Sequence, residues 1–204
     1  MTQATKSITQ FATAVALILL LGAGAWLATA VAVFCVAVAA PAPWRPAVPL
    51  RSLAAYGVWL LIWVIFAASY LRVMSALGYA VEPQPPLVEL ARQGGSTPQF
   101  WPLLLMIVVA APLVEEIIFR GYLLTSIRSA APRWAAHLVV ATLFGLAHGL
   151  GHALPIGVLS LVFGYLREKH GSLLPSVLAH ACHNGIMVTV SLTWPELLDL
   201  FYAR

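Results

Sequence analysis

Two adjacent carboxylates, Glu115 and Glu116, close a long apolar stretch of the chain, and Arg120 follows four positions after the second. A charged side chain in the centre of a bilayer costs about 2.5–3.5 kcal/mol even on insertion scales, so carboxylates there indicate function. Residues four apart share one helix face, and Glu116 can therefore pair with Arg120. Glu115 points about 100° away around the helix and lacks this partner. The spacing predicts one paired, ionised carboxylate and one that is freer to exchange a proton, as acid and base roles require.

For this pattern alone, a second interpretation is equally good: the charged side chains lie at a helix end, reach the membrane surface and only anchor the helix. Two further apolar segments favour a site. One runs from Phe144 to His148 and ends in an imidazole, and the other carries His180 and Asn184 four residues apart. A lone histidine on an apolar helix is more often a satisfied core residue. Polar groups on three helices, however, are costly in hydrocarbon unless they meet one another or water.

If these side chains converge, they provide a general base, a second proton carrier and hydrogen-bond donors for a developing oxyanion. Those are the groups needed for water to attack an amide bond. The predicted chemistry is therefore peptide hydrolysis.

The elements that must position these residues are membrane helices. The chain has 204 residues, of which 61% are hydrophobic and only 9% charged, whereas a soluble domain carries about 25% charged residues. A helix needs about 20 apolar residues to cross the hydrocarbon, and several stretches without any Asp, Glu, Lys or Arg are that long or longer. They are residues 7–44, 52–71, 93–114, 134–166 and 170–195. The chain is therefore an integral membrane protein.

We predict an all-α fold, a polytopic membrane helix bundle of about six transmembrane helices with a four-helix catalytic core. Phe11 to Ala40 is interpreted as one uncleaved helix, because the apolar part of a secretory signal has only about 7–15 residues. Gly149, Gly151 and Pro155 predict a tight reversal inside the stretch 134–166. The other helices are expected near Leu53–Met74, Trp101–Ser126, Trp134–Gly149, Leu154–Leu166 and Leu173–Leu192.

Three regions are expected along the chain. Residues 1–99 hold two N-terminal transmembrane helices and a polar linker, with a short interfacial helix around Leu87–Arg92. Residues 100–192 form the catalytic core, and residues 193–204 form a short tail along the membrane surface. The net charge of +4 does not indicate nucleic-acid binding, because the basic residues lie mostly in short loops, where they set orientation. With one helix in 11–40, their distribution favours an N-terminus outside.

The patterns Glu-Glu-x-x-x-Arg, Phe-x-x-x-His and His-x-x-x-Asn, in this order on successive helices, resemble the CAAX protease and bacteriocin-processing family of intramembrane proteases. The resemblance covers about half of the chain, from Trp101 to Val190. It implies a membrane-embedded endopeptidase that cuts a membrane-anchored or C-terminally tagged protein or peptide. The implied partners are this substrate and the lipid bilayer, with no nucleic acid, and the implied location is the bacterial inner (plasma) membrane.

The resemblance also implies a role for each motif residue. Glu115 with His148 activates the attacking water. His180 and Asn184 stabilise the oxyanion, and Glu116 and Arg120 support the site.

We expect no cofactor. Zinc held by Glu115, His148 and His180 is the less favoured alternative, since a Glu/His set suits this metal but the HExxH pattern of soluble metalloproteases is missing. His152 and His183 are predicted to line the cavity. The alternative function is a non-proteolytic membrane protein, such as a bacteriocin-immunity factor or a small proton- or ion-coupled transporter. The chain shows no internal repeat, the usual basis of alternating access, which weakens the transporter interpretation.

Overall fold

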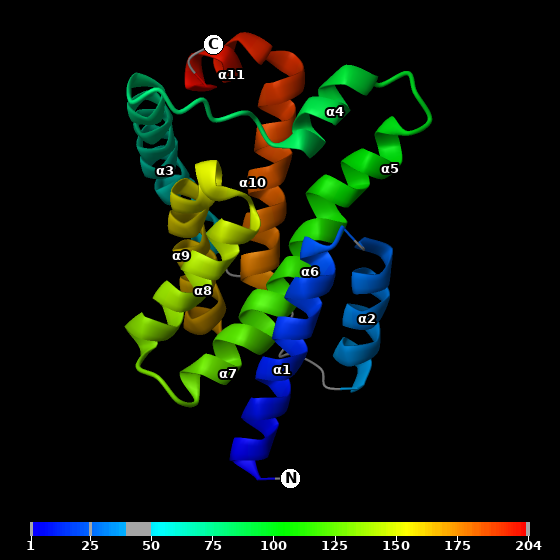
Figure 1. Cartoon of the computed structure of the whole chain (residues 1–204), viewed down its shortest axis with the longest axis vertical. Helices are drawn as coiled ribbons and strands as arrows, with labels where there is room; N and C mark the ends of the chain where they lie inside the picture. The colour runs from blue at the N-terminus through cyan, green and yellow to red at the C-terminus, as the bar shows by residue number, and fades with distance from the viewer. Residues whose placement is uncertain (1, 25, 40–49, 203–204) are drawn as a thin grey trace.

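The computed structural model describes residues 2–24, 26–39 and 50–202, and every regular element in these ranges is helical (Figure 1). This confirms the all-α prediction. The helices are α1 (Gln3–Gly22), α2 (Trp26–Ala39), α3 (Leu50–Ala76), α4 (Pro85–Gln93), α5 (Phe100–Leu105), α6 (Ala111–Glu116), α7 (Leu124–Arg128), α8 (Arg133–Ala147), α9 (Ala153–His170), α10 (Leu174–Thr193) and α11 (Pro195–Tyr202).

Helices α5, α6 and α7 are parts of one continuous helix, Phe100–Arg128, which carries the carboxylate pair. They are joined by two π-helical segments, Met106–Ala110 and Ile117–Leu123, which lie on either side of Glu115 and Glu116. π-helical turns are rare and occur frequently at functional sites. We refer to Phe100–Arg128 below as the carboxylate helix.

Within the described residues, four helical segments are long and apolar enough to cross a membrane: Gln3–Gly22, Ala54–Ala76, Phe100–Arg128 and Leu150–His170. The shorter apolar helix α8 and the 20-residue helix α10 pack among them. A membrane helix bundle is therefore confirmed. The five helices predicted after residue 50 are found with bounds that differ by only a few residues.

The single helix predicted from Phe11 to Ala40 is wrong. This segment forms two helices, α1 and α2, which lie side by side and are joined by a turn with Gly24 at φ +74°. A positive φ is readily adopted only by glycine. Hydropathy does not register the turn, because Gly22, Ala23 and Gly24 carry neither charge nor polar side chain.

This hairpin changes the expected orientation. The start of α1 lies beside α7, where the Ser126 hydroxyl donates to the carbonyl oxygen of Ser7 at 2.6 Å (Figure 1). We call this end of the bundle the basic end, because the parts of α1, α7, α8 and α9 that lie there carry Lys6, Arg128, Arg133, Arg167 and Lys169. Arg72 and Arg92 belong to the last turns of α3 and α4, which lie at the opposite end (Figure 1). With two helices in place of one, the excess of basic residues in cytoplasmic loops favours a cytoplasmic basic end and an N-terminus inside.

The glycine-rich reversal between α8 and α9 is confirmed. Gly149 adopts φ +94°, and the 3-10 turn Leu150–His152 leads into α9. The two helices pack backbone to backbone, because a Cβ on Gly145 would overlap the carbonyl oxygen of Ala153. Only glycine permits this approach.

Two short helices lie at the end of the bundle opposite the basic end (Figure 1). Helix α4 corresponds to the short helix expected around Leu87–Arg92, and α11 forms the expected tail. On α4, two hydrogen bonds from Arg92 lower the pKa of Glu89 to about 2. This exposed ion pair stabilises only the local helix surface.

Candidate functional site

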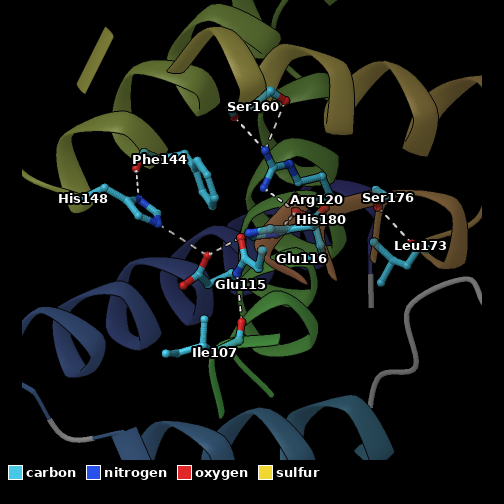
Figure 2. Close-up of polar contacts among 11 residues, drawn as sticks. Ile107, Glu115, Glu116, Arg120, Phe144, His148, Ser160, Leu173, Ser176 and His180 are labelled. Atoms are coloured by element: carbon cyan, nitrogen blue, oxygen red, sulfur yellow. Dashed lines mark hydrogen bonds and ion pairs between the residues drawn. The ribbon is translucent and has the colours of Figure 1, made fainter. Parts of the chain in front are cut away.

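The second carboxylate of the pair lies in a fully buried polar cluster. Arg120 Nη1 donates to Glu116 Oε1 at 2.8 Å, and both side chains are 0% exposed, which confirms the predicted ion pair. Arg120 Nη2 donates to the hydroxyl and the carbonyl oxygen of Ser160 on α9, at 2.7 and 3.1 Å (Figure 2). The guanidinium carbon also lies 4.4 Å from the ring centroid of Phe144, a cation–π distance. We call Glu116, Arg120 and Ser160 the buried cluster.

The first carboxylate faces two imidazoles instead. Glu115 Oε2 lies 3.7 Å from His148 Nε2 and 3.8 Å from His180 Nε2 (Figure 2). Both distances are too long for a direct hydrogen bond. They have the length at which a water molecule can bridge two polar atoms. The three side chains predicted to converge therefore do so, and we call them the open cluster.

Hydrogen bonds fix the orientation of both imidazole rings. His148 Nδ1 lies 2.7 Å from the carbonyl oxygen of Phe144, which can only accept, so Nδ1 is the protonated nitrogen. In neutral His148 the Nε2 lone pair is therefore turned toward Glu115. His180 Nδ1 lies 3.0 Å from Glu116 Oε1, and its ring stacks on Phe163 at 4.7 Å. Since the carboxylate paired with Arg120 is an acceptor, Nδ1 of His180 also donates, and Nε2 is left facing Glu115.

The short length of α8 explains how His148 reaches the middle of the carboxylate helix. Its 15 residues span about 22 Å, less than the ~30 Å of bilayer hydrocarbon. Starting at the basic end, α8 stops within the depth of the bundle. His148, the residue after its last turn, thus lies beside Glu115 rather than at the far surface.

Asn184 comes close to the open cluster from α10. Its amide Nδ2 donates to the carbonyl oxygen of Ile107 at 2.9 Å, within the first π-helical segment. An amide carries two N–H groups, so one donor and the carbonyl oxygen stay available for other partners.

His152 and His183 lie around the same space, as predicted. His183 Nδ1 is 3.1 Å from the hydroxyl of Tyr56, and its ring meets Trp63 edge-on at 4.6 Å. His152 Nε2 is 3.2 Å from the hydroxyl of Tyr202 on α11. His183 thus connects α10 to α3, and His152 connects the 3-10 turn before α9 to α11.

The four residues predicted to act on the substrate, Glu115, His148, His180 and Asn184, face one cavity of about 430 Å³, which His152 and His183 also line. Its walls are mainly apolar and come from α3, the carboxylate helix, α9 and α10. Residues of α4 and α11 line its outer part. A polar group of this kind inside an apolar cavity can hold water and a peptide bond while excluding bulk solvent.

Three contributors could not be recognised in the sequence. Ser160 and Phe163 lie on an apolar helix without polar periodicity, and Tyr56 is 127 positions away from its partner His183. Side chains that act through tertiary contacts give no local spacing signal.

Glu115, His148 and His180 are also the side chains that would hold zinc in the alternative interpretation. The Nδ1 atoms of His148 and His180 are held by hydrogen bonds, as the second ring nitrogen of a metal-ligating histidine usually is. However, within the described residues no group of three or more His, Cys, Asp or Glu side chains has the spacing of a metal site.

The fold and the cavity define the class, an integral membrane protein with a Glu/His site enclosed by helices. Residues 97–186 match the family model described as type II CAAX prenyl endopeptidase Rce1-like. The match confirms the predicted resemblance for this segment and supports assignment as a CAAX-type peptidase. It begins just before α5, ends within α10 and contains both the buried and the open cluster. No curated protein and no solved structure matches the chain.

Proposed function

We propose that the protein is an intramembrane endopeptidase of the bacterial inner (plasma) membrane. It hydrolyses a peptide bond near the membrane in a membrane-anchored or C-terminally tagged protein or peptide. The observation that carries this proposal is the open cluster, in which two Nε2 atoms lie 3.7 and 3.8 Å from Glu115 Oε2 and all three side chains face the cavity.

In the proposed reaction, a water molecule is held between Glu115 Oε2 and the Nε2 lone pair of His148. One of its protons passes to this pair of bases while its oxygen bonds to the carbonyl carbon of the substrate. The same proton is later delivered to the leaving nitrogen as the C–N bond breaks. Glu115 and His148 thus serve first as base and then as acid.

The oxyanion is assigned to His180 and Asn184. The free N–H of the Asn184 amide is one donor, and the other is Nε2–H of His180 in its protonated form. Glu116 stabilises that form through its hydrogen bond to Nδ1. Arg120 and Ser160 hold Glu116 in place, and they are positioning residues rather than catalytic ones.

We further propose that the reaction needs no metal. The experiment is hydrolysis of a membrane-anchored peptide by the purified protein in liposomes, before and after exhaustive chelation. We expect unchanged turnover after chelation, since the Glu/His pair itself activates the water. Loss of turnover that returns with added zinc would replace this mechanism by the zinc alternative and leave the endopeptidase assignment intact.

The same liposomes separate the two classes of function. A pH-sensitive dye inside them reports proton flux. No hydrolysis of any anchored peptide, together with proton or ion flux, would identify the protein as a transporter.

A further inference from the structure

A second, polar pocket of about 410 Å³ lies at the basic end, between α7, α8 and α9. It is separate from the catalytic cavity and shares none of that cavity's lining residues. Its polar lining consists of Arg120, Thr125, Arg128, Arg133, Arg167 and Glu168. Four guanidinium groups around one hollow are unusual in a chain with so few charges.

The positive charge of this pocket is only partly neutralised. Arg120 is paired with Glu116 in the buried cluster. Among the residues that line the pocket, Glu168 is the only acidic one. Its carboxylate already forms ion pairs with Arg128 Nε at 3.0 Å, Arg133 Nε at 2.5 Å and His137 Nε2 at 3.0 Å. One carboxylate therefore faces three arginines, which leaves the pocket with an excess of positive charge.

An independent observation is the presence of donors without acceptors. Among the described residues, Arg167 Nε and Arg120 Nε are both buried and have no hydrogen-bond partner. A buried donor without a partner destabilises the fold, and more so when it is charged. An anion in the pocket would supply the missing acceptors, and the planar fork of arginine matches phosphate oxygens best.

The pocket lies where α7 and α9 end and α8 begins, and the ends of membrane helices are where a bundle meets the membrane surface. The basic end is the one that the distribution of Lys and Arg assigns to the cytoplasm. Anionic headgroups are concentrated at that surface, and basic pockets between transmembrane helices bind them.

We propose that this pocket is a phosphate-binding site, filled by the phosphate of an anionic phospholipid headgroup or by free phosphate. The guanidinium groups of Arg128, Arg133 and Arg167 hold the phosphate oxygens, while Glu168 sets the spacing between them. Because Arg120 lines the pocket and also pairs with Glu116, the site borders the buried cluster that supports the catalytic groups.

The experiment uses the full chain in phosphatidylcholine nanodiscs. Phosphatidylglycerol is substituted stepwise for phosphatidylcholine, and thermal stability and lipid retention by native mass spectrometry are measured. A parallel arm adds inorganic phosphate at constant ionic strength. We expect saturable stabilisation of the wild type. The double variant Arg133→Gln/Arg167→Gln should bind at least about tenfold more weakly, because charge-assisted hydrogen bonds to phosphate are lost.

A matched control removes the same charge elsewhere. Arg72→Gln/Arg92→Gln, two exposed arginines outside the basic end, should bind as the wild type does. Arg133→Gln alone, whose side chain is 57% exposed, covers the case in which the double variant does not fold. Full stabilisation by inorganic phosphate would identify the free anion as the ligand, whereas an effect of phosphatidylglycerol alone identifies the lipid. Equal binding by the wild type and both pocket variants would overturn the proposal.

Discussion

Glu115 and Glu116 are neighbours in the chain, yet they belong to two regions with different chemistry. In the buried cluster, Glu116 is 0% exposed and makes direct contacts of 2.8 Å to Arg120 and 3.0 Å to His180. In the open cluster, Glu115 faces the cavity, and its nearest imidazole nitrogens lie 3.7 and 3.8 Å away. Groups in direct contact hold a structure together, whereas groups one water apart leave room for a reactant. The comparison therefore separates a structural role for Glu116 from the chemical role proposed for Glu115, within one helical turn.

The two regions meet at one side chain. His180 Nδ1 contacts Glu116 in the buried cluster, while its Nε2 faces Glu115 in the open cluster. A change in the buried cluster should therefore affect activity through the orientation and protonation of this ring. A change in the open cluster should leave the fold intact.

The largest expected effect is on turnover. Glu115→Gln keeps the shape of the side chain but removes the base, and we expect a loss of about 10²–10⁴-fold in kcat with little change in Tm. The measurement is hydrolysis of an anchored peptide in liposomes beside thermal unfolding. Glu89→Gln, on the exposed face of α4, is the matched control and should match the wild type. Retained turnover in Glu115→Gln would break the distinction between the two carboxylates.

The next effect is on stability. Glu116→Gln leaves the fully buried Arg120 without a counter-charge, and we expect a loss of about 3–5 kcal/mol in addition to reduced activity. Thermal or denaturant unfolding in detergent micelles measures it. Removing the charge of the other partner, with Arg120→Gln, should destabilise the fold by a similar amount. Equal and mild effects of Glu115→Gln and Glu116→Gln would contradict the comparison.

A smaller effect is expected at Gly145, where α8 packs closely against α9. Gly145→Ala places a methyl group against the carbonyl oxygen of Ala153, and such overpacking costs roughly 1–3 kcal/mol. Because Phe144 and His148 flank this position, kcat should fall together with Tm. Gly57→Ala is the control, since a Cβ there meets open space. If Gly145→Ala were as stable and active as this control, the close approach of α8 and α9 would not matter for the site.

Much of the segment that matches the family model was predictable from the sequence. Charges are so rare that Glu115, Glu116 and Arg120 stand out, and the four-residue spacing correctly assigns Arg120 to Glu116. The glycines around residue 149 mark the reversal, because a single helix over residues 134–166 would be too long to cross the bilayer hydrocarbon once. Both signals are local and strong.

The N-terminal hairpin and the long-range contacts were less predictable, because neither leaves a local signal in the sequence. The turn at Gly24 consists of small apolar residues, so composition does not distinguish a hairpin from one long helix. The contacts of Ser160 with Arg120, across 40 positions, and of Tyr56 with His183, across 127, depend on which helices pack together. Spacing along the chain carries no information on such pairs.

The two π-helical segments that flank the carboxylate pair have a consequence for how the chain can vary. A π-helical turn closes its hydrogen bonds over five residues rather than four, and thus holds one more residue than an α-helical turn. Deleting a single residue from one of these segments would convert it to ordinary α-helix and shift the residues within it around the helix axis relative to Glu115 and Glu116. Arg120 would then leave Ser160, or Ile107 would leave Asn184. The length of this helix is therefore constrained on both sides of the site, so substitutions in it should be tolerated far better than insertions or deletions.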